Sequence, residues 1–242
     1  NKLTFHQQEK SIMSLFKKFK NDSCTQATQL LDSSVATVEE MQKIYSELFP
    51  PSKLSDASNA FVGSATAATN EPVARAVKTT LDQVSEVNNM FDKLDLFIAL
   101  HVPKIEDGGN FGVGVQLDLV KKLSEMKETS NKSIETLLGY ESARADALGK
   151  LNLPSSTSSV KKSTSVTTTD GKKEEKISES TEDNQSSTVS TGPAYESRVA
   201  SVVAVDTLYY SKARGILSQT IISVVAVMDF MDKNKDKLTE PK

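Results

Sequence analysis

The chain has 242 residues, a length that allows one large domain or two small ones. Its 29 basic and 32 acidic residues give a net charge of −3, so no positive excess is available to bind nucleic acid or an anionic membrane. The single cysteine, Cys24, excludes a disulfide framework and a cysteine-rich zinc site, and it suits a reducing compartment. No signal-peptide core opens the chain, and no uncharged apolar run reaches the roughly 20 residues of a membrane span. We therefore expect neither nucleic acid nor a membrane as a partner.

Seven prolines divide the chain into long proline-free stretches, in which apolar residues recur every three or four positions. Proline inside a helix costs about 3 kcal/mol, so this spacing is typical of helices separated by proline-containing connections. The periodicity predicts amphipathic helices over residues 4–48, 72–101, 111–152 and 194–239. Antiparallel packing of these helices predicts an all-α fold, an up-down four-helix bundle, as a single domain over residues 1–242.

The fourth predicted helix is rich in β-branched residues, at 201–205 and 220–225, which favour strands. We predict a helix because the apolar residues cover more than one face without strict alternation, and no turn signal interrupts them. A helix with so wide an apolar arc must be buried on several sides. A single four-helix bundle does not cover that arc, so we also expect self-association.

The two long connections differ in composition. Residues 50–71 contain two adjacent prolines and a run of small residues, and they are interpreted as a crossover linker. Residues 154–193 hold eleven serines and eight threonines among forty positions. The segment has too few apolar residues for their burial to offset the entropy lost on ordering the chain. We predict that 154–193 is a disordered polar insert between the third and fourth helices. Its charged centre, 172–176, is interpreted as a solvated tether, with a docking or phosphorylation site as the alternative.

Four of the ten glycines fall between Gly108 and Gly114, in the connection between the second and third helices. Their spacing matches neither nucleotide-binding glycine pattern, and a helix precedes them where the dinucleotide fold needs a strand. Glu106 and Asp107 are adjacent on an exposed loop, without the burial that separates the pKa values of a catalytic carboxylate pair. Polar contact or helix capping by Asp107 or Asn110 is the better interpretation.

The remaining reactive side chains do not form a recognisable catalytic or metal-binding pattern. His6 and His101 are isolated imidazoles, and a metal site needs several ligands. Cys24 has no histidine near it in the sequence, so we interpret it as a small helix residue rather than a nucleophile. The serines and threonines lack a nucleophile-elbow motif. We expect no catalytic residue, no cofactor, no metal and no enzymatic activity.

The segment 103–116 reads Pro-Lys-Ile-Glu-Asp-Gly-Gly-Asn-Phe-Gly-Val-Gly-Val-Gln. It closely resembles the activation loop of the 11S proteasome activators, the REG family, usually Pro-[Arg/Lys]-Ile-Glu-Asp-Gly-Asn-Asn-Phe-Gly-Val-Ala-Val-Gln. Twelve of the fourteen positions agree. Weaker similarities to the family lie at Phe49-Pro50 with Lys53 and Ser55, at Tyr140, Ser142, Arg144, Asp146, Ala147 and Lys150, and at Lys237-Leu238 with Pro241.

The resemblance implies a heptameric ring of four-helix subunits that caps the 20S proteasome without ATP and raises peptide hydrolysis. We expect a homo-heptamer, and the sequence leaves open whether a second subunit type joins the ring. It also implies a location in the cytoplasm, the nucleus or both. The activation loop, residues 103–114, would press on the turns around the closed gate in the proteasome α-ring. Its contacting residues would be Lys104, Ile105, Glu106, Asp107, Gly108, Gly109, Asn110, Phe111 and Gly112. Each subunit's C-terminal carboxylate would bind a pocket between proteasome α-subunits.

Three features depart from the family pattern. Gly109 stands where the family usually has asparagine. The polar insert lies between the third and fourth helices, whereas some animal members carry an insert between the first and second. Family members usually run several residues past the Lys-Leu-x-x-Pro stretch, so no residue up to Lys242 is assigned to the pocket-binding tail. The alternative is a helical-bundle scaffold or coiled-coil adaptor without proteasome binding, which has no use for such a loop.

Overall fold

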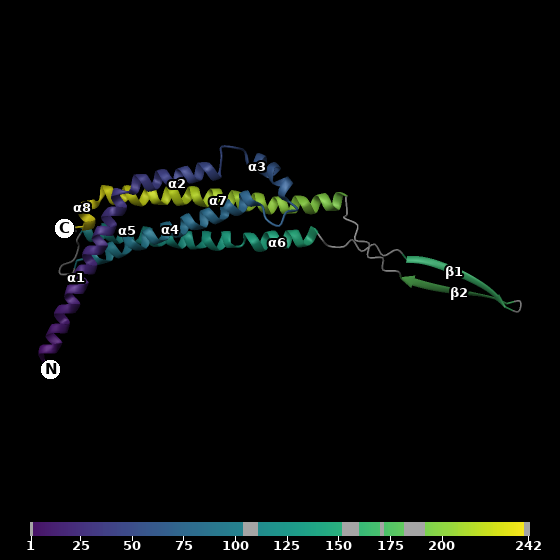
Figure 1. Cartoon of the computed structure of the whole chain (residues 1–242), viewed down its shortest axis with the longest axis horizontal. Coiled ribbons are helices and arrows are strands. Elements are labelled where there is room, and N and C mark those ends of the chain that lie inside the picture. The colour runs from purple at the N-terminus through teal and green to yellow at the C-terminus, as the bar shows by residue number, and fades with distance from the viewer. Residues whose placement is uncertain (1, 104–110, 152–159, 170–171, 182–191, 240–242) are drawn as a thin grey trace.

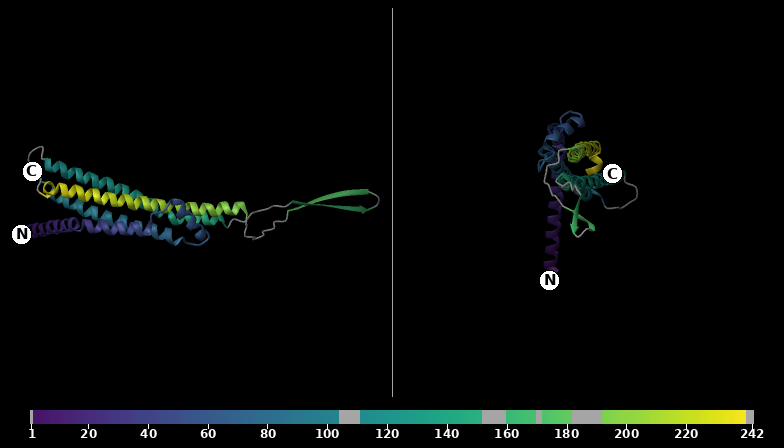
Figure 2. Two further views of the ribbon diagram at one scale, coloured as in Figure 1. Left: turned by 90° about the horizontal axis from the view of Figure 1, so that it is seen from above. Right: turned by 90° about the vertical axis from the view of Figure 1, so that its right-hand side faces the viewer.

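The computed structural model describes residues 2–103, 111–151, 160–169, 172–181 and 192–239. Within them, four helical rods lie side by side (Figure 1). The rods are α1 (Lys2–Asp32) with α2 (Ser34–Leu48), α4 (Glu71–His101), α5 (Phe111–Leu138) with α6 (Tyr140–Leu151), and α7 (Pro193–Lys233) with α8 (Lys235–Thr239). The predicted all-α four-helix bundle is therefore confirmed. Both labelled termini lie at one end of the bundle in two views (Figures 1 and 2).

Three rods contain an internal break that the apolar periodicity did not reveal. At Ser33 the N-terminal part of the first rod turns away from the bundle (Figure 1). At Gly139, between α5 and α6, an added Cβ would lie 2.9 Å from the Tyr209 hydroxyl oxygen, closer than real Cβ contacts. A side chain at this position would therefore displace the hydroxyl of Tyr209, which belongs to α7. At Asn234 the chain leaves α7 and begins the short α8.

Helix α7 is the central helix of the bundle. It contacts α2, α3, α4, α5 and α6, and this burial on several sides outweighs the strand preference of its β-branched residues. Val202, Leu217 and Val224 are fully buried. By length and composition alone α7 is apolar enough to cross a membrane, a property that core helices share. Leu208, Ile222 and Val225 remain exposed on its outer face.

The crossover between the first two rods contains structure that the sequence did not predict. Helix α3 (Leu54–Phe61) and the 3₁₀ turn η1 (Val62–Ser64) interrupt the expected linker over 50–71. The Lys53 backbone N–H donates to Asp56 Oδ2 at 3.1 Å, which starts α3. Phe61 is buried with its ring centroid 5.4 Å from that of Tyr210, so an aromatic contact holds α3 against α7.

A buried ion pair joins the crossover to the third and fourth rods. Arg144 of α6 donates from Nε to Asp206 Oδ1 of α7 at 2.9 Å, and the two side chains are 1% and 0% exposed. The other guanidinium nitrogens of Arg144 donate to backbone carbonyls of the crossover, those of Ser64, Ala67 and Ala68, at 2.7–2.9 Å. One side chain therefore satisfies three carbonyls that helices do not pair.

Two further side chains complete the coordination of Asp206. Tyr140 Oη donates to Oδ1 at 2.9 Å, and Asn70 Nδ2 donates to Oδ2 at 2.8 Å. Burial, and next the hydrogen bond to Asp206, raise the pKa of Tyr140 well above its usual value, so the phenol stays a donor. Each Asp206 oxygen therefore has a donor, which is the condition under which a buried charge is tolerated.

Between the third and fourth rods the structure contains a β-hairpin where the sequence predicted disorder over 154–193. Strands β1 (Val160–Thr169) and β2 (Lys172–Thr181) pair antiparallel, with Thr169 opposite Lys172. The sequence carries two signals for this, a β-branched run at 167–169 and Asp-Gly at 170–171, a dipeptide typical of two-residue hairpin turns. The prediction of disorder rested on the low apolar content of this segment, which does not exclude a hairpin with these local signals. Residues 154–159, 170–171 and 182–191 lie outside the described part.

The hairpin extends beyond the end of the bundle opposite the termini (Figures 1 and 2). Apart from their mutual pairing, β1 and β2 make no extensive contact with any described helix. The bundle therefore does not depend on the hairpin for its packing.

We expect that replacing Asp206 with alanine destabilises the bundle by about 3–5 kcal/mol, because Arg144 is left as an uncompensated buried charge. Urea unfolding at a fixed protomer concentration measures the change. Asp229→Ala is the control, because Asp229 pairs with Lys233 on the exposed surface and should matter little. Similar losses in the two variants would contradict the importance assigned to the buried pair.

Deleting residues 156–190 should leave the helical content, the unfolding midpoint and the oligomeric state unchanged, because the hairpin packs on nothing in the bundle. Circular dichroism and sedimentation velocity measure these properties. A shift in sedimentation to a smaller species would show that the insert contributes to assembly.

Candidate functional site

The candidate site is the end of the bundle where α4 stops and α5 starts. Of the expected loop residues, Lys104, Ile105, Glu106, Asp107, Gly108, Gly109 and Asn110 lie outside the described part of the structure. The described flanks are residues 101–103 and 111–116, here called the loop base. Phe111 is 70% exposed, whereas Gly112 is buried. The loop base lies at the same end of the bundle as α8 (Figure 1).

Gln116 connects the two sides of the loop base to α8. Its Nε2 donates to the backbone carbonyl of His101 at 3.2 Å and to that of Leu238 at 2.9 Å. Gln116 is completely buried, and among the described residues none gives its Oε1 a hydrogen bond. One amide therefore joins the end of α4, the first turns of α5 and the C-terminal helix.

A second contact between α8 and the loop base lies at the surface. Lys237 Nζ lies 4.8 Å from the centre of the Phe111 ring, a cation–π geometry. The next residue, Leu238, is 1% exposed and belongs to the main core. Consecutive residues of α8 thus contact the first residue of α5 and the buried interior.

Cys24 and His101 meet behind the loop base, although 77 positions separate them. The Cys24 Sγ lies 3.1 Å from His101 Nε2, and His101 Nδ1 lies 2.7 Å from the Phe97 carbonyl oxygen. Because a carbonyl only accepts, Nδ1 carries the hydrogen and Nε2 of the neutral imidazole accepts from the thiol. This half-buried contact fixes α1 against the end of α4. The sequence did not predict it, because it depends on the register between the two helices.

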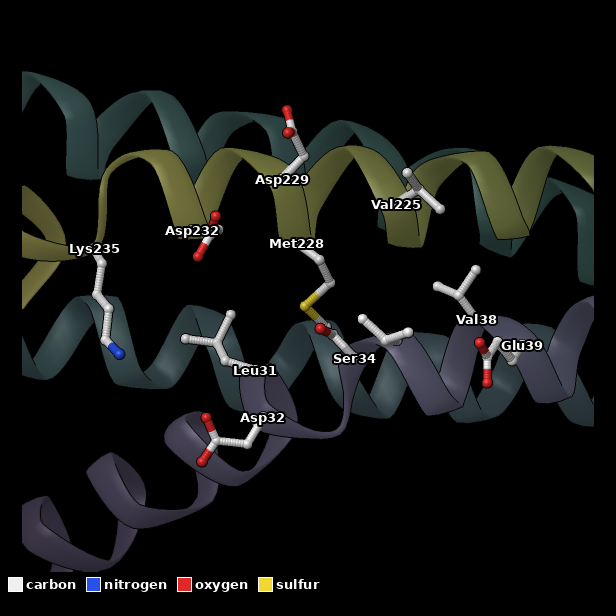
Figure 3. A pocket seen from close by; sticks show the side chains of 11 residues that line it. Leu31, Asp32, Ser34, Val38, Glu39, Val225, Met228, Asp229, Asp232 and Lys235 are labelled. Carbon is white, nitrogen blue, oxygen red and sulfur yellow. The ribbon is translucent and has the colours of Figure 1, made fainter.

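Other grooves lie on the surface of the described part of the chain. One of about 520 Å³ lies where α1 meets α2 against α7, with Leu31, Val38 and Met228 in its lining (Figure 3). Of the acids around it, Asp229 is paired with Lys233 at 2.7 Å. Within the described ranges, no group of three or more His, Cys, Asp or Glu side chains is arranged to hold a metal ion.

Gln116 is the functional side chain that the sequence analysis did not single out. It closes the segment that carries the resemblance, and it shares a helical face with the buried residues Gly112, Val115 and Leu119. A polar residue on an otherwise apolar helical face is a signal for a buried hydrogen-bonded group. The partner carbonyls come from elsewhere in the chain and could not be read from that face.

Comparison with known proteins gives matches in both sequence and fold. The family model described as proteasome activator PA28, C-terminal, matches residues 66–173. The chain is 32% identical over 66 residues to proteasome activator 28 of Dictyostelium discoideum, a segment that spans 27% of this chain and 29% of that protein. The family-model match includes the loop residues 103–114.

Two solved structures share the fold over nearly the whole chain. The 11S subunit of the Plasmodium falciparum proteasome, PA28, superposes with a TM-score of 0.66 at 18% identity, covering 96% of this chain and 95% of the other. A chain in the structure of an archaeal 20S proteasome in complex with a mutated P26 activator also gives 0.66, at 16% identity and 95% coverage of each.

The long four-helix bundle, with its loop base and C-terminal helix at one end, defines the class of PA28-like helical bundles. Residues 66–173 match the proteasome activator PA28 family model, the chain is similar to the Dictyostelium protein over 66 residues, and the fold of nearly the whole chain is that of the Plasmodium 11S subunit.

Proposed function

We propose that this chain is an ATP-independent activator that caps the 20S proteasome and opens its gate. The observation that carries the proposal is the meeting of the loop base and α8 at one end of the bundle, held by Gln116. A single partner surface can therefore engage the loop and the C-terminal segment together. The match to the PA28 family model over residues 66–173 and the loop sequence support the proteasome α-ring as that surface.

A repeated assembly makes weak loop contacts sufficient. Moving a gate from 1:99 to 99:1 takes about 5.5 kcal/mol, so seven identical loops need to supply only about 0.8 kcal/mol each. Several C-terminal segments on one ring also bind the same partner with multivalent strength. We therefore propose a homo-heptameric ring as the active form, as the family resemblance implies.

Exposed apolar surface on the bundle supports self-association. A groove of about 810 Å³ runs between α3 and the N-terminal half of α7, and its lining includes Leu54, Val62, Val199, Val203 and Leu208. A second set of exposed leucines, Leu96, Leu117 and Leu138, lies on α4 and α5. An apolar groove on one side of the subunit and exposed leucines on other helices suit the head-to-tail contacts of a closed ring.

The assay that tests the function is hydrolysis of a fluorogenic peptide by purified 20S proteasome, with and without the chain, in the absence of nucleotide. The wild type should stimulate hydrolysis severalfold. Gly109→Tyr should abolish stimulation while the ring stays assembled, because a bulky side chain in the loop blocks its contact with the gate.

The matched control is Gly149→Tyr, which adds the same side chain at an exposed glycine with open space around it. It lies in α6, away from the loop base, and should stimulate like the wild type. Undiminished stimulation by Gly109→Tyr would contradict the role of the loop. A wild-type chain that neither binds nor stimulates the 20S particle would favour the scaffold alternative.

Placing a charge in the α3–α7 groove should dissociate the ring. Leu208 is 50% exposed and lines this groove, so Leu208→Glu should shift native mass and sedimentation from seven copies towards monomers without loss of helix content. Ser142→Glu, a charge on an exposed position of α6 that does not line the α3–α7 groove, is the control. An unchanged mass for Leu208→Glu would place the contact between copies elsewhere.

A further inference from the structure

We propose that Gln116 is a positioning residue that couples α8 to the loop base, so that engagement of the C-terminal segment by a partner sets the arrangement of residues 101–103 and 111–116. This inference deepens the proposed function and rests on it. It concerns the described flanks of the loop and the buried amide between them.

The hydrogen bonds of Gln116 leave no freedom in how the three elements meet. The side-chain amide has two N–H donors, and both are used, on the carbonyls of His101 and Leu238. Each carbonyl belongs to the last turn of a helix, where backbone acceptors lack intrahelical partners. A movement of either helix end therefore breaks a bond that no neighbouring helical amide replaces.

The burial of Gln116 argues for a role beyond filling space. Its Oε1 is buried and unpartnered, a cost that a leucine of similar size would not incur. The advantage of glutamine over leucine is therefore that its two N–H donors fix the positions of the two helix ends. It does not improve the packing.

Helix α8 is a short element that is separate from α7 and packs on α5 and α4. It has five residues, and the break at Asn234 separates it from α7. Its contacts with the loop base come from adjacent residues, with Lys237 over the exposed Phe111 ring and Leu238 on Gln116. A displacement of α8 would therefore change its contact with the start of α5 and, through Gln116, its connection to the end of α4.

Coupling of this kind separates binding from activation. A variant without the Gln116 donors keeps the C-terminal segment and so still binds a partner, but binding no longer selects one arrangement of the loop base. Its maximal stimulation should fall while the concentration that gives half-maximal stimulation changes little. A merely destabilised bundle would instead lose both together.

The test compares Gln116→Leu with the wild-type ring. We expect helix content and sedimentation to be unchanged, half-maximal stimulation within about threefold of wild type, and maximal stimulation lowered about tenfold. Hydrogen exchange of residues 112–119 and 235–239 in the ring alone should be about tenfold faster, a measurement that needs no proteasome.

The matched control is Thr80→Val, because Thr80 is also buried in the bundle with an unpartnered hydroxyl oxygen but lies on α4 away from the loop base. It should behave as wild type in every measurement. If Gln116→Leu fails to assemble, Gln116→Met, which keeps the length and flexibility of the side chain, replaces it with the same expectations.

Unchanged maximal stimulation by Gln116→Leu, or equal losses in half-maximal concentration and maximum, would overturn the coupling. Unchanged exchange in residues 235–239 would show that the amide does not hold α8. A wild-type chain without any stimulation is a different failure, because it overturns the proposed function while the exchange measurement still decides whether Gln116 joins the helices.

Discussion

The buried pair between Arg144 and Asp206 is the interaction on which the arrangement of the rods depends. Four long amphipathic helices can slide along one another without losing much apolar contact, and a directional polar group fixes their register. Arg144 joins α6, α7 and the crossover in one set of hydrogen bonds. Because Arg144 fixes the crossover, the start of α4 has a defined position along the bundle axis. The length of α4 then determines where it ends, at the loop base. The buried ion pair beside the start of α4 thus determines the position of the loop base at the other end of that helix.

The loop base repeats the same design on a smaller scale. Gln116 and Arg144 are each buried in an apolar interior, and each donates to backbone carbonyls that helices leave unpaired. In both places the apolar residues supply stability and one polar side chain supplies position. This division explains how so aliphatic a core specifies a single arrangement.

Much of this architecture could be predicted from the sequence, because proline spacing and apolar periodicity act locally. The four rods follow from those signals, and the loop was recognised by its resemblance to a family. The breaks at Ser33 and Gly139 could not be predicted, since Gly139 is explained only by the approach of Tyr209 from another helix. The contact of Cys24 with His101 depends likewise on the register of two distant helices. The hairpin at 160–181 was not predicted for another reason. Its Asp-Gly turn signal is present in the sequence, but the prediction of disorder rested only on the low apolar content of the segment.

The hairpin leaves the molecule where α6 ends and α7 begins, neighbouring helices in contact with each other. An insert whose two ends lie close together can change in length or charge without altering the register of the bundle helices. In any ring built from these subunits, such hairpins would form a fringe on the rim away from the loop base. The length and charge of the hairpin can therefore change in evolution without disturbing the packing that positions the loop base.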